Sequence, residues 1–276
     1  MPKVKDIIAV LENYAPPTSA ESWDNPGLQV GDYNADVAKL TVALDPTPDI
    51  ISDSIEMGAE LLVTHHPLLF PSISTIDTGT PTGDSIAHAI INGLSIYCAH
   101  TNLDRSSKGP TAALVQTLAL KNVTSIDAQK NMNNKTESLT EAENMSVLMG
   151  ELSPPLSLLD FAQHVKRSLG ATIVRLVGNE NMIVRFVAVC GGSGGDYLNL
   201  AHEKGAHVFV TGEVGYHRAL QASFWKDAMG VIEAGHYYSE RGVLDELVRL
   251  IDEASSHFGW EISTVALSGK DPFIYI

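Results

Sequence analysis

Cysteine is scarce in this chain, whose 276 residues include only two, Cys98 and Cys190. Both lie in apolar segments with the pattern of strands, and they do not form a C-x-x-C motif. Cysteines in such segments are usually reduced members of a core. We therefore expect two buried thiols and no redox motif.

Basic residues are also few. Eighteen Lys and Arg stand against 33 Asp and Glu, which gives a formal net charge of -15. This charge opposes general binding to phosphate backbones and to anionic lipid, so we expect no nucleic-acid partner. An anionic substrate would need a local positive centre, and a bound divalent cation is a compact way to supply one.

Long apolar runs are missing from the sequence. No stretch reaches the ~18 consecutive apolar residues that indicate a membrane helix. Residues 1–11 include Lys3 and Lys5 but lack the unbroken apolar region of a signal peptide. We expect no membrane partner and a cytoplasmic location, with the nucleus and the mitochondrion left open.

A hydrophobic content of 44% over 276 residues is enough for one large domain or two of ordinary size. Strand and helix patterns alternate regularly along the first half of the chain. Strands that alternate with helices indicate βαβ units, with parallel strands and right-handed crossovers. We predict an opening helix through residues 4–11, strands at 40–44, 61–64 and 95–99, and helices at 48–57, 82–91 and 110–120.

Residues 121–144 are polar with weak periodicity, and we predict a linker or loop there. A second alternating set follows this segment and indicates a second αβ unit. Its predicted elements are strands at 146–151, 172–177, 184–190, 207–210 and 230–233, and helices at 157–169, from 197, from 216 and from 236 to 251. Final strands near 262–267 and 273–276 are expected to return to the first sheet.

Two neighbouring predicted strands end in polar side chains that can bind ligands. One apolar run stops at Thr64-His65-His66-Pro67, where Pro67 ends strand pairing and holds His66 extended, so both rings can face a site beyond the strand. The next strand ends in His100-Thr101-Asn102-Leu103-Asp104. Ligands of open α/β sheets bind beyond these carboxyl ends. Taken alone, the histidine pair also fits a loop with incidental histidines.

Imidazoles and carboxylates together predict a site for transition metals. His236 and Glu240 are four residues apart and share one face of a predicted helix. With His65, His66 and Asp104 they form a mixed set that suits Zn, Fe, Ni or Mn better than Ca or Mg. Five ligands are too many for one tetrahedral ion and suit two ions with a bridging carboxylate, for which we choose Glu240. Two metal ions this close together lower the pKa of a water molecule bound to them.

Several short motifs are spread in order over nearly the whole chain: Ser22-Trp23-Asp24-Asn25 with Gly27-Leu28, Thr64-His65-His66-Pro67, Ala99-His100-Thr101-Asn102-Leu103-Asp104, Thr211-Gly212-Glu213, and His236 with Glu240-Arg241-Gly242. Together they resemble the Nif-three-like (YbgI) family, whose members are often labelled GTP cyclohydrolase 1 type 2 homologues. The resemblance implies two divalent transition-metal ions per chain, held by the same five residues that chemistry and spacing select.

The resemblance also implies an α/β fold, α+β in some schemes, with two αβ lobes, mixed sheets and the dinuclear metal site in the cleft between the lobes. We place the lobes at residues 1–123 and 145–235, with 236–276 returning to the first. Members of the family are similar in forming hexamers from dimers, so a homo-hexamer is expected. The chain departs from the family pattern at two positions. Pro26 replaces an apolar or small residue, and Glu213 stands where many bacterial members have Asp. Residues 121–144 also leave no room for the additional middle domain of longer members.

Three residues are candidates for proton transfer: His100 beside the metal cluster, His217 near the Thr211-Gly212-Glu213 motif, and Glu240.

A glycine-rich segment follows one of the predicted strands of the second unit. This segment, Cys190-Gly191-Gly192-Ser193-Gly194-Gly195-Asp196, could form a phosphate-binding nest. Because Asp196 would repel an anion and the spacing is no dinucleotide fingerprint, we favour a tight turn from strand to helix.

We therefore predict a metal-dependent hydrolase that acts on a small molecule, either a nucleotide or a phosphoester. The family label would make the reaction a ring opening of GTP, although the sequence has no convincing phosphate loop or basic cluster. Two alternatives belong to other classes. One is a metal-binding regulatory or scaffold protein that acts through protein partners, such as transcription factors, and the other is metal storage or delivery.

Overall fold

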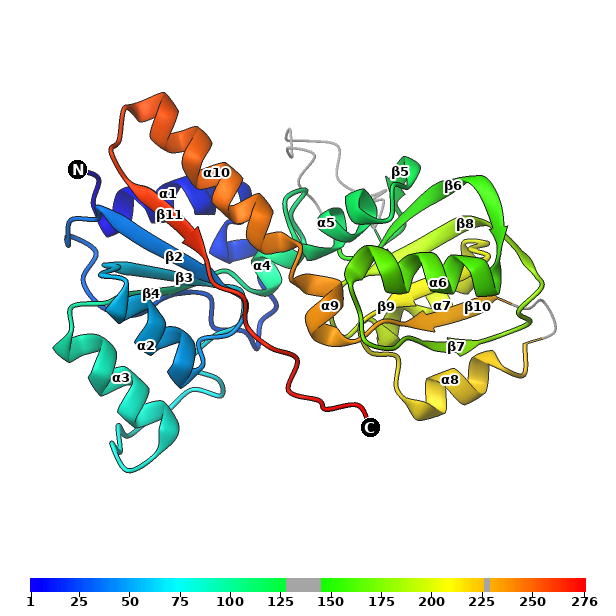
Figure 1. Cartoon of the computed structure of the whole chain (residues 1–276), viewed down its shortest axis with the longest axis horizontal. Helices are drawn as coiled ribbons and strands as arrows, with labels where there is room; N and C mark the ends of the chain where they lie inside the picture. Colours follow the sequence, from blue (N-terminus) through cyan, green and yellow to red (C-terminus); the bar gives the residue numbers. More distant parts are fainter. Residues whose placement is uncertain (128–144, 226–228) are drawn as a thin grey trace. The chain divides into compact units, whose positions relative to one another are not determined.

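The computed structural model describes residues 1–127, 145–225 and 229–276. The chain divides into two compact units. Unit 1 comprises Met1–Lys108 and Leu244–Lys270, and unit 2 comprises Gly109–Val243 and Asp271–Ile276. Each unit contains its own mixed sheet with helices packed on it, which confirms the predicted α/β class (Figure 1).

The sheet of unit 1 is parallel except at one edge. Its spatial order is β1 (Gly27–Val30), β4 (Ser95–Cys98), β3 (Leu61–Thr64), β2 (Lys39–Ala43) and β11 (Ser263–Ala266). Only β1 runs antiparallel to its neighbour. All four residues of β3 are buried, as expected for a central parallel strand covered on both faces. The carboxyl ends of β2, β3 and β4 consequently lie together at one edge.

Helices cover both faces of this sheet, with α2 and α3 on one face and α1 and α10 on the other (Figure 1). Both α2 and α3 begin in the same way: a threonine hydroxyl, of Thr47 or Thr80, accepts a backbone N–H of the first turn, and a proline follows it. The helical elements of unit 1 are α1 (Val4–Tyr14), the 3₁₀ turn η1 (Pro17–Ser19), α2 (Pro48–Glu56), α3 (Pro81–Ile91), α4 (Thr101–Asp104) and α10 (Val243–Phe258).

The sheet of unit 2 has a parallel centre and antiparallel edges. Its spatial order is β5 (Lys121–Ser125), β6 (Leu148–Ser157), β8 (Ile183–Cys190), β9 (Val208–Thr211), β10 (Gly230–Glu233) and β7 (Arg175–Val177). Strands β8, β9 and β10 pair in parallel, and the remaining pairs are antiparallel. Residues that alternate along β8 enter two cores, Val187 and Val189 on one face and Ala188 and Cys190 on the other.

Helices fill both cores of unit 2. Helix α6 packs into the first core with Phe161 and Val165, and α7 packs into the second with Leu198 and Ala201. Gly170 ends α6 in the left-handed conformation that favours glycine. The helical elements of unit 2 are α5 (Pro110–Thr117), α6 (Leu158–Leu169), the 3₁₀ turn η2 (Gly195–Tyr197), α7 (Leu198–Glu203), α8 (Tyr216–Ala222) and α9 (His236–Glu240).

Several predictions of local structure were wrong. Residues 121–125 form the edge strand β5 and not a loop; their side chains are mostly exposed, so they carry no apolar pattern. The rest of the predicted linker, 128–144, lies outside the described residues. Strand β1 was missed because only one of its four residues is buried. The helix predicted from 236 is interrupted after Glu240 and resumes as α10. Residues 273–276 form no strand.

The unit boundaries also differ from the predicted ones. The boundary predicted at 123 falls inside β5, whose pairing with β6 places it in unit 2. Helix α9 follows β10 directly and belongs to unit 2 as well, so the chain returns to unit 1 only at Leu244. There β11 pairs in parallel with β2. Cys98 and Cys190 are buried and are not joined in a disulfide. In the described part of the chain, no helix combines the length and the apolar character needed to span a membrane.

Candidate metal site

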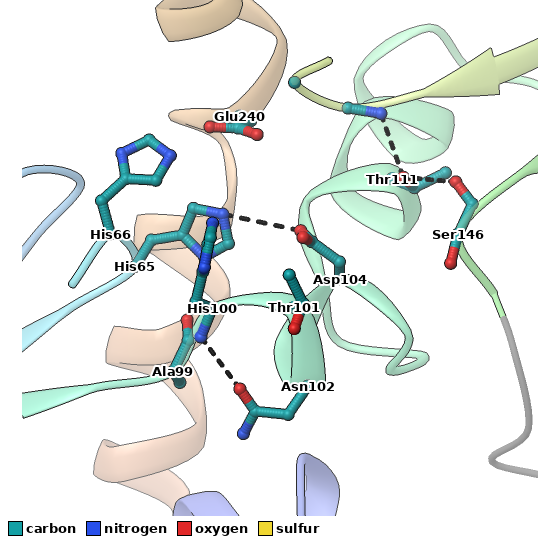
Figure 2. Close-up of polar contacts among 12 residues, drawn as sticks. His65, His66, Ala99, His100, Thr101, Asn102, Asp104, Thr111, Ser146 and Glu240 are labelled. Atoms are coloured by element: carbon teal, nitrogen blue, oxygen red, sulfur yellow. Dashed lines mark hydrogen bonds and ion pairs between the residues drawn. The ribbon is translucent and has the colours of Figure 1, made fainter. Parts of the chain in front are cut away.

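His65 is a buried ligand candidate at the end of β3. Its side chain is fully buried, and its ring Nδ1 lies 2.9 Å from the carbonyl oxygen of Ala99. The other ring nitrogen, Nε2, lies 3.5 Å from Oδ1 of Asp104 on α4 (Figure 2). The parallel pairing of β3 with β4 brings these residues together, because His65 and Ala99 each follow the last paired residue of their strand. The structure thus joins two of the predicted ligands.

The next residue, His66, is anchored by a carboxylate. Its Nδ1 lies 2.7 Å from Oδ1 of Asp45, which follows β2. Strand β2 pairs with β3 so that Ala43 is opposite Thr64, and Asp45 and His66 each lie two residues beyond this pair. The sheet register therefore sets the partner of His66.

His100 is held by a network of buried polar groups. Its Nδ1 lies 2.8 Å from Oδ1 of Asp24, whose side chain is fully buried. The other oxygen of Asp24 accepts hydrogen bonds from the backbone N–H and hydroxyl of Thr101, at 3.0 and 2.5 Å. Burial alone raises the pKa of a carboxyl, but the hydrogen bonds from His100 and Thr101 outweigh it and hold the pKa of Asp24 well below its ordinary value.

Three imidazoles meet at this end of unit 1 (Figure 2). The ring centres of His65 and His66 are 4.8 Å apart, and that of His100 lies 5.3 Å from the first and 5.5 Å from the second. One nitrogen from each ring lies within 4.8 Å of the others, the spacing of groups that can hold a metal ion. His100 therefore belongs to the same cluster as the predicted ligands, and its role as a proton-transfer residue stays a prediction.

Unit 2 carries a second group on α9. His236 Nδ1 lies 3.1 Å from Oε1 of Glu213, and its Nε2 lies 3.1 Å from Oε2 of Glu240. The spacing of four residues places Nε2 and the carboxylate on one face of the helix, as predicted. The Glu240 side chain is only 5% exposed, and a buried carboxylate is costly unless a cation or hydrogen-bond donors compensate its charge.

The glycine-rich turn after β8 packs directly against this second group. A Cβ added to Gly192 would overlap Oε1 of Glu240 and lie 3.3 Å from Nε2 of His236. The backbone N–H of Gly192 donates to the Ser239 hydroxyl, and that of Gly194 donates to the Thr211 hydroxyl. These two donors are therefore engaged within the protein. The segment forms a tight turn from strand to helix, the interpretation favoured over a phosphate nest.

The tautomer of each anchored histidine follows from its partner. Carboxylate and carbonyl oxygens only accept hydrogen bonds, so Nδ1 of His65, His66 and His236 must carry the proton. A neutral ring then offers only the lone pair of Nε2, which is the form that binds first-row transition metals. Both units thus place such lone pairs or carboxylate oxygens close together, and the donor set fits divalent metal ions.

Within each unit the structure brings predicted ligands together: His65 lies beside His66 and Asp104 in unit 1, and His236 lies beside Glu240 in unit 2. His217 is different: it is exposed on α8 with its ring against Tyr216, and it joins no cluster of potential ligands among the described residues. Sequence reasoning missed Asp45 as a contributor. The same rule of polar residues at strand ends would have found it, because Asp45 follows β2.

Loss of the Asp24 carboxylate is expected to destabilise unit 1. Asp24→Ala leaves buried donors of His100 and Thr101 without their acceptor, which costs roughly 1–3 kcal/mol at neutral pH. Because folding lowers the pKa of Asp24, the ionic part of this contribution is present above the unfolded-state pKa of about 3.9 and is lost as the pH falls below it. Urea denaturation at about pH 5 and about pH 3 should show a smaller difference from wild type at the lower pH.

The exposed Asp53 on α2 provides the matched control. Asp53→Ala removes one carboxylate from the same unit and should leave the unfolding free energy within about 0.5 kcal/mol of wild type. A deficit of Asp24→Ala that stays constant between the two pH values would contradict the ionised, hydrogen-bonded state of Asp24.

Two mixed sheets and clusters of histidine and carboxylate at strand ends define the class of protein: an α/β protein with groups compatible with metal binding. The model of the family described as Duf34/NIF3 (NGG1p interacting factor 3) matches residues 2–272. The chain belongs to this family, which confirms the resemblance seen in its motifs.

Curated relatives match over nearly the full length. A Clostridium perfringens protein named "GTP cyclohydrolase 1 type 2 homolog" is 33% identical over 275 residues, which cover 99% of this chain and 100% of the relative. A Streptomyces coelicolor protein of the same name is 29% identical and covers 99% of this chain and 94% of the relative. The alignment with a Staphylococcus aureus relative extends over 371 positions, so that relative has a long insertion compared with the 276 residues here.

Solved structures show the same fold. The crystal structure of Staphylococcus aureus protein SA1388 has a TM-score of 0.89 and 28% identity, and covers 100% of this chain and 99% of that chain. The structure of reduced HcgD from Methanocaldococcus jannaschii has a TM-score of 0.75 and 26% identity, and covers 97% and 98% of the two chains.

Proposed function

We propose that this protein binds two divalent transition-metal ions, of Zn, Fe, Ni or Mn. The proposed ligands are His65, His66, Asp104, His236 and Glu240, with Glu240 as the bridge. One observation carries the proposal. The Nδ1 atom of His236 faces the carboxylate of Glu213, and its Nε2 atom lies 3.1 Å from an oxygen of the nearly buried Glu240. A neutral ring in this tautomer and a carboxylate are both electron-pair donors, and a shared cation stabilises them at this distance.

The same arrangement in unit 1 supports the proposal. His65 is fully buried, its Nδ1 faces the carbonyl of Ala99, and its Nε2 lies 3.5 Å from Asp104. Donor atoms of this mixed type suit first-row transition metals. The net charge of -15 points the same way, because an anionic substrate would need positive charge at the site to offset repulsion by the protein.

We further propose that the protein is a metal-dependent hydrolase that acts on a nucleotide or a phosphoester. When bound, divalent ions act as Lewis acids and activate water for attack on carbon or phosphorus. The names of the Clostridium and Streptomyces relatives support a nucleotide substrate. His100 would move the proton: Asp24 holds its Nδ1, so Nε2 is the atom that accepts a proton from, or returns one to, the reacting groups.

A substrate screen tests this proposal. Protein loaded separately with Zn, Fe(II), Ni or Mn would be incubated with GTP, other nucleoside triphosphates and nitrophenyl phosphate esters. We expect turnover of at least one of them, with a formylated product if GTP is ring-opened, and a loss of roughly 10²–10⁴-fold in His100→Ala, the usual contribution of a general acid–base group.

The exposed His217 serves as the comparison for His100. His217→Ala should lose activity only if the prediction that it is catalytic is correct. Failure of all four metal-loaded forms to turn over any substrate, with metal demonstrably bound, would contradict a hydrolase. That result would favour the metal storage or delivery alternative, or the regulatory alternative that the family description as an interacting factor suggests.

A further inference from the structure

The three proposed histidine ligands are anchored in two different ways. Nδ1 of the fully buried His65 faces a neutral main-chain carbonyl, that of Ala99. Nδ1 of His66 and of His236 instead face carboxylates, Asp45 at 2.7 Å and Glu213 at 3.1 Å. The two carboxylate-anchored rings are also the more exposed ones, at 21% and 34%. Surrounding side chains hold them less completely than they hold His65.

The two carboxylate–histidine pairs have the same origin in the fold. In unit 1, Asp45 lies two residues beyond the end of β2, and His66 lies two residues beyond the end of the neighbouring parallel strand β3. In unit 2, Glu213 lies two residues beyond the end of β9, and His236 lies three residues beyond the end of the neighbouring parallel strand β10. Each sheet thus places an acid at the end of one strand and a histidine at the end of the next.

Folding stability does not explain why carboxylates lie at positions 45 and 213. Asp45 is 41% exposed and Glu213 is 53% exposed, and ion pairs or hydrogen bonds at such exposed positions contribute little to folding. Their direct effect is on the ring itself: an acceptor at Nδ1 sets the tautomer, limits rotation about the Cβ–Cγ bond, and makes Nε2 a stronger electron-pair donor. These effects matter only if Nε2 binds something.

We propose that Asp45 and Glu213 are positioning residues for metal binding, which hold His66 and His236 with Nε2 toward the ion and make that nitrogen more basic. This inference rests on the proposed metal site. It predicts that the affinity for metal depends on two carboxylates that do not themselves bind the ion.

Zinc affinity of the full chain, measured by competition with a chromophoric chelator, tests the inference. Asp45→Ala and Glu213→Ala are each expected to weaken zinc binding about 10- to 100-fold with an unchanged midpoint of urea denaturation. Asp45→Asn and Glu213→Gln keep an amide oxygen that accepts from Nδ1, so they should recover part of the lost affinity. Exposed carboxylates of the same units serve as controls: Asp53→Ala on α2 and Glu203→Ala on α7 should bind zinc like wild type.

A spectroscopic readout separates positioning from a purely structural role. In metal-free protein labelled with ¹⁵N-histidine, long-range ¹⁵N–¹H spectra report which ring nitrogen carries the proton. The His66 ring should lose its preference for the Nδ1–H form in Asp45→Ala and keep it in Asp53→Ala. The same comparison applies to His236 in Glu213→Ala and Glu203→Ala.

Different failures have different meanings. Wild-type protein that binds zinc, together with Ala variants of equal affinity and unchanged tautomers, would overturn the positioning role and leave the metal site intact. Wild-type protein that binds no zinc would overturn the proposed metal site and this inference with it.

Discussion

Glu240→Ala is expected to abolish the binding of both metal ions. Wild-type protein purified without chelator should carry about two transition-metal ions per chain, the content of a site with a bridging carboxylate. Glu240 is nearly buried and lies 3.1 Å from Nε2 of His236, so its removal deletes the proposed bridge and the carboxylate that faces this nitrogen. Elemental analysis of wild type and variant, run side by side, measures this directly.

Asp104→Ala provides a graded comparison. Asp104 lies 3.5 Å from His65 and is not the proposed bridge, so its loss should lower the metal content less than loss of Glu240. Glu203→Ala, an exposed carboxylate on α7, should retain the wild-type content. Folding of each variant is checked by circular dichroism. Equal metal content in wild type, Asp104→Ala and Glu240→Ala would rule out the proposed ligand set, whatever activity the protein has.

Gly192→Ala is expected to remove metal binding without changing any ligand. The new methyl group would overlap Oε1 of Glu240 and lie 3.3 Å from Nε2 of His236. Glu240 is only 5% exposed, so its carboxylate cannot move aside freely. The residue also has a φ of +59°, where a side chain costs about 1–2 kcal/mol. We expect a metal content close to that of Glu240→Ala, together with a lowered midpoint of urea denaturation.

Gly205→Ala separates the overlap with Glu240 from the cost of a side chain at positive φ. Gly205 belongs to the same unit and has a φ of +79°, but a Cβ there would meet no atom within 4 Å. This control should share the destabilisation of about 1–2 kcal/mol that comes from the left-handed backbone and should bind metal normally. If Gly192→Ala keeps the metal content of Gly205→Ala, the turn after β8 has no part in shaping the site.

Much of the fold could be predicted because its signals are local. The apolar run that ends at Val63 is a central parallel strand covered on both faces, and the caps and prolines of α2 and α3 mark where these helices begin. The errors arose where local signals are weak. Strand β5 is an edge strand with exposed, polar side chains, and its existence depends on pairing with β6.

The candidate site also has parts that the sequence could predict and parts that it could not. His65, His66, Asp104, His236 and Glu240 could be proposed from the sequence, because residue type and position at a strand end or on one helix face restrict the chemistry. Which acid faces which ring could not be proposed in this way. Asp45 lies 21 residues from its partner His66, and Asp24 lies 76 residues from its partner His100. Only the pairing of strands brings such residues into contact.

The sequence by itself determined the α/β class, the family and the types of candidate ligand, since hydrophobic periodicity and side-chain chemistry are properties of short segments. The tertiary structure alone decided which acceptor faces each Nδ1, and therefore which nitrogen anchors each ring. It also decided that a side chain at residue 192 would meet the carboxylate of Glu240. Both outcomes depend on strand register and on close approach between segments that are far apart in the chain, which local patterns do not encode.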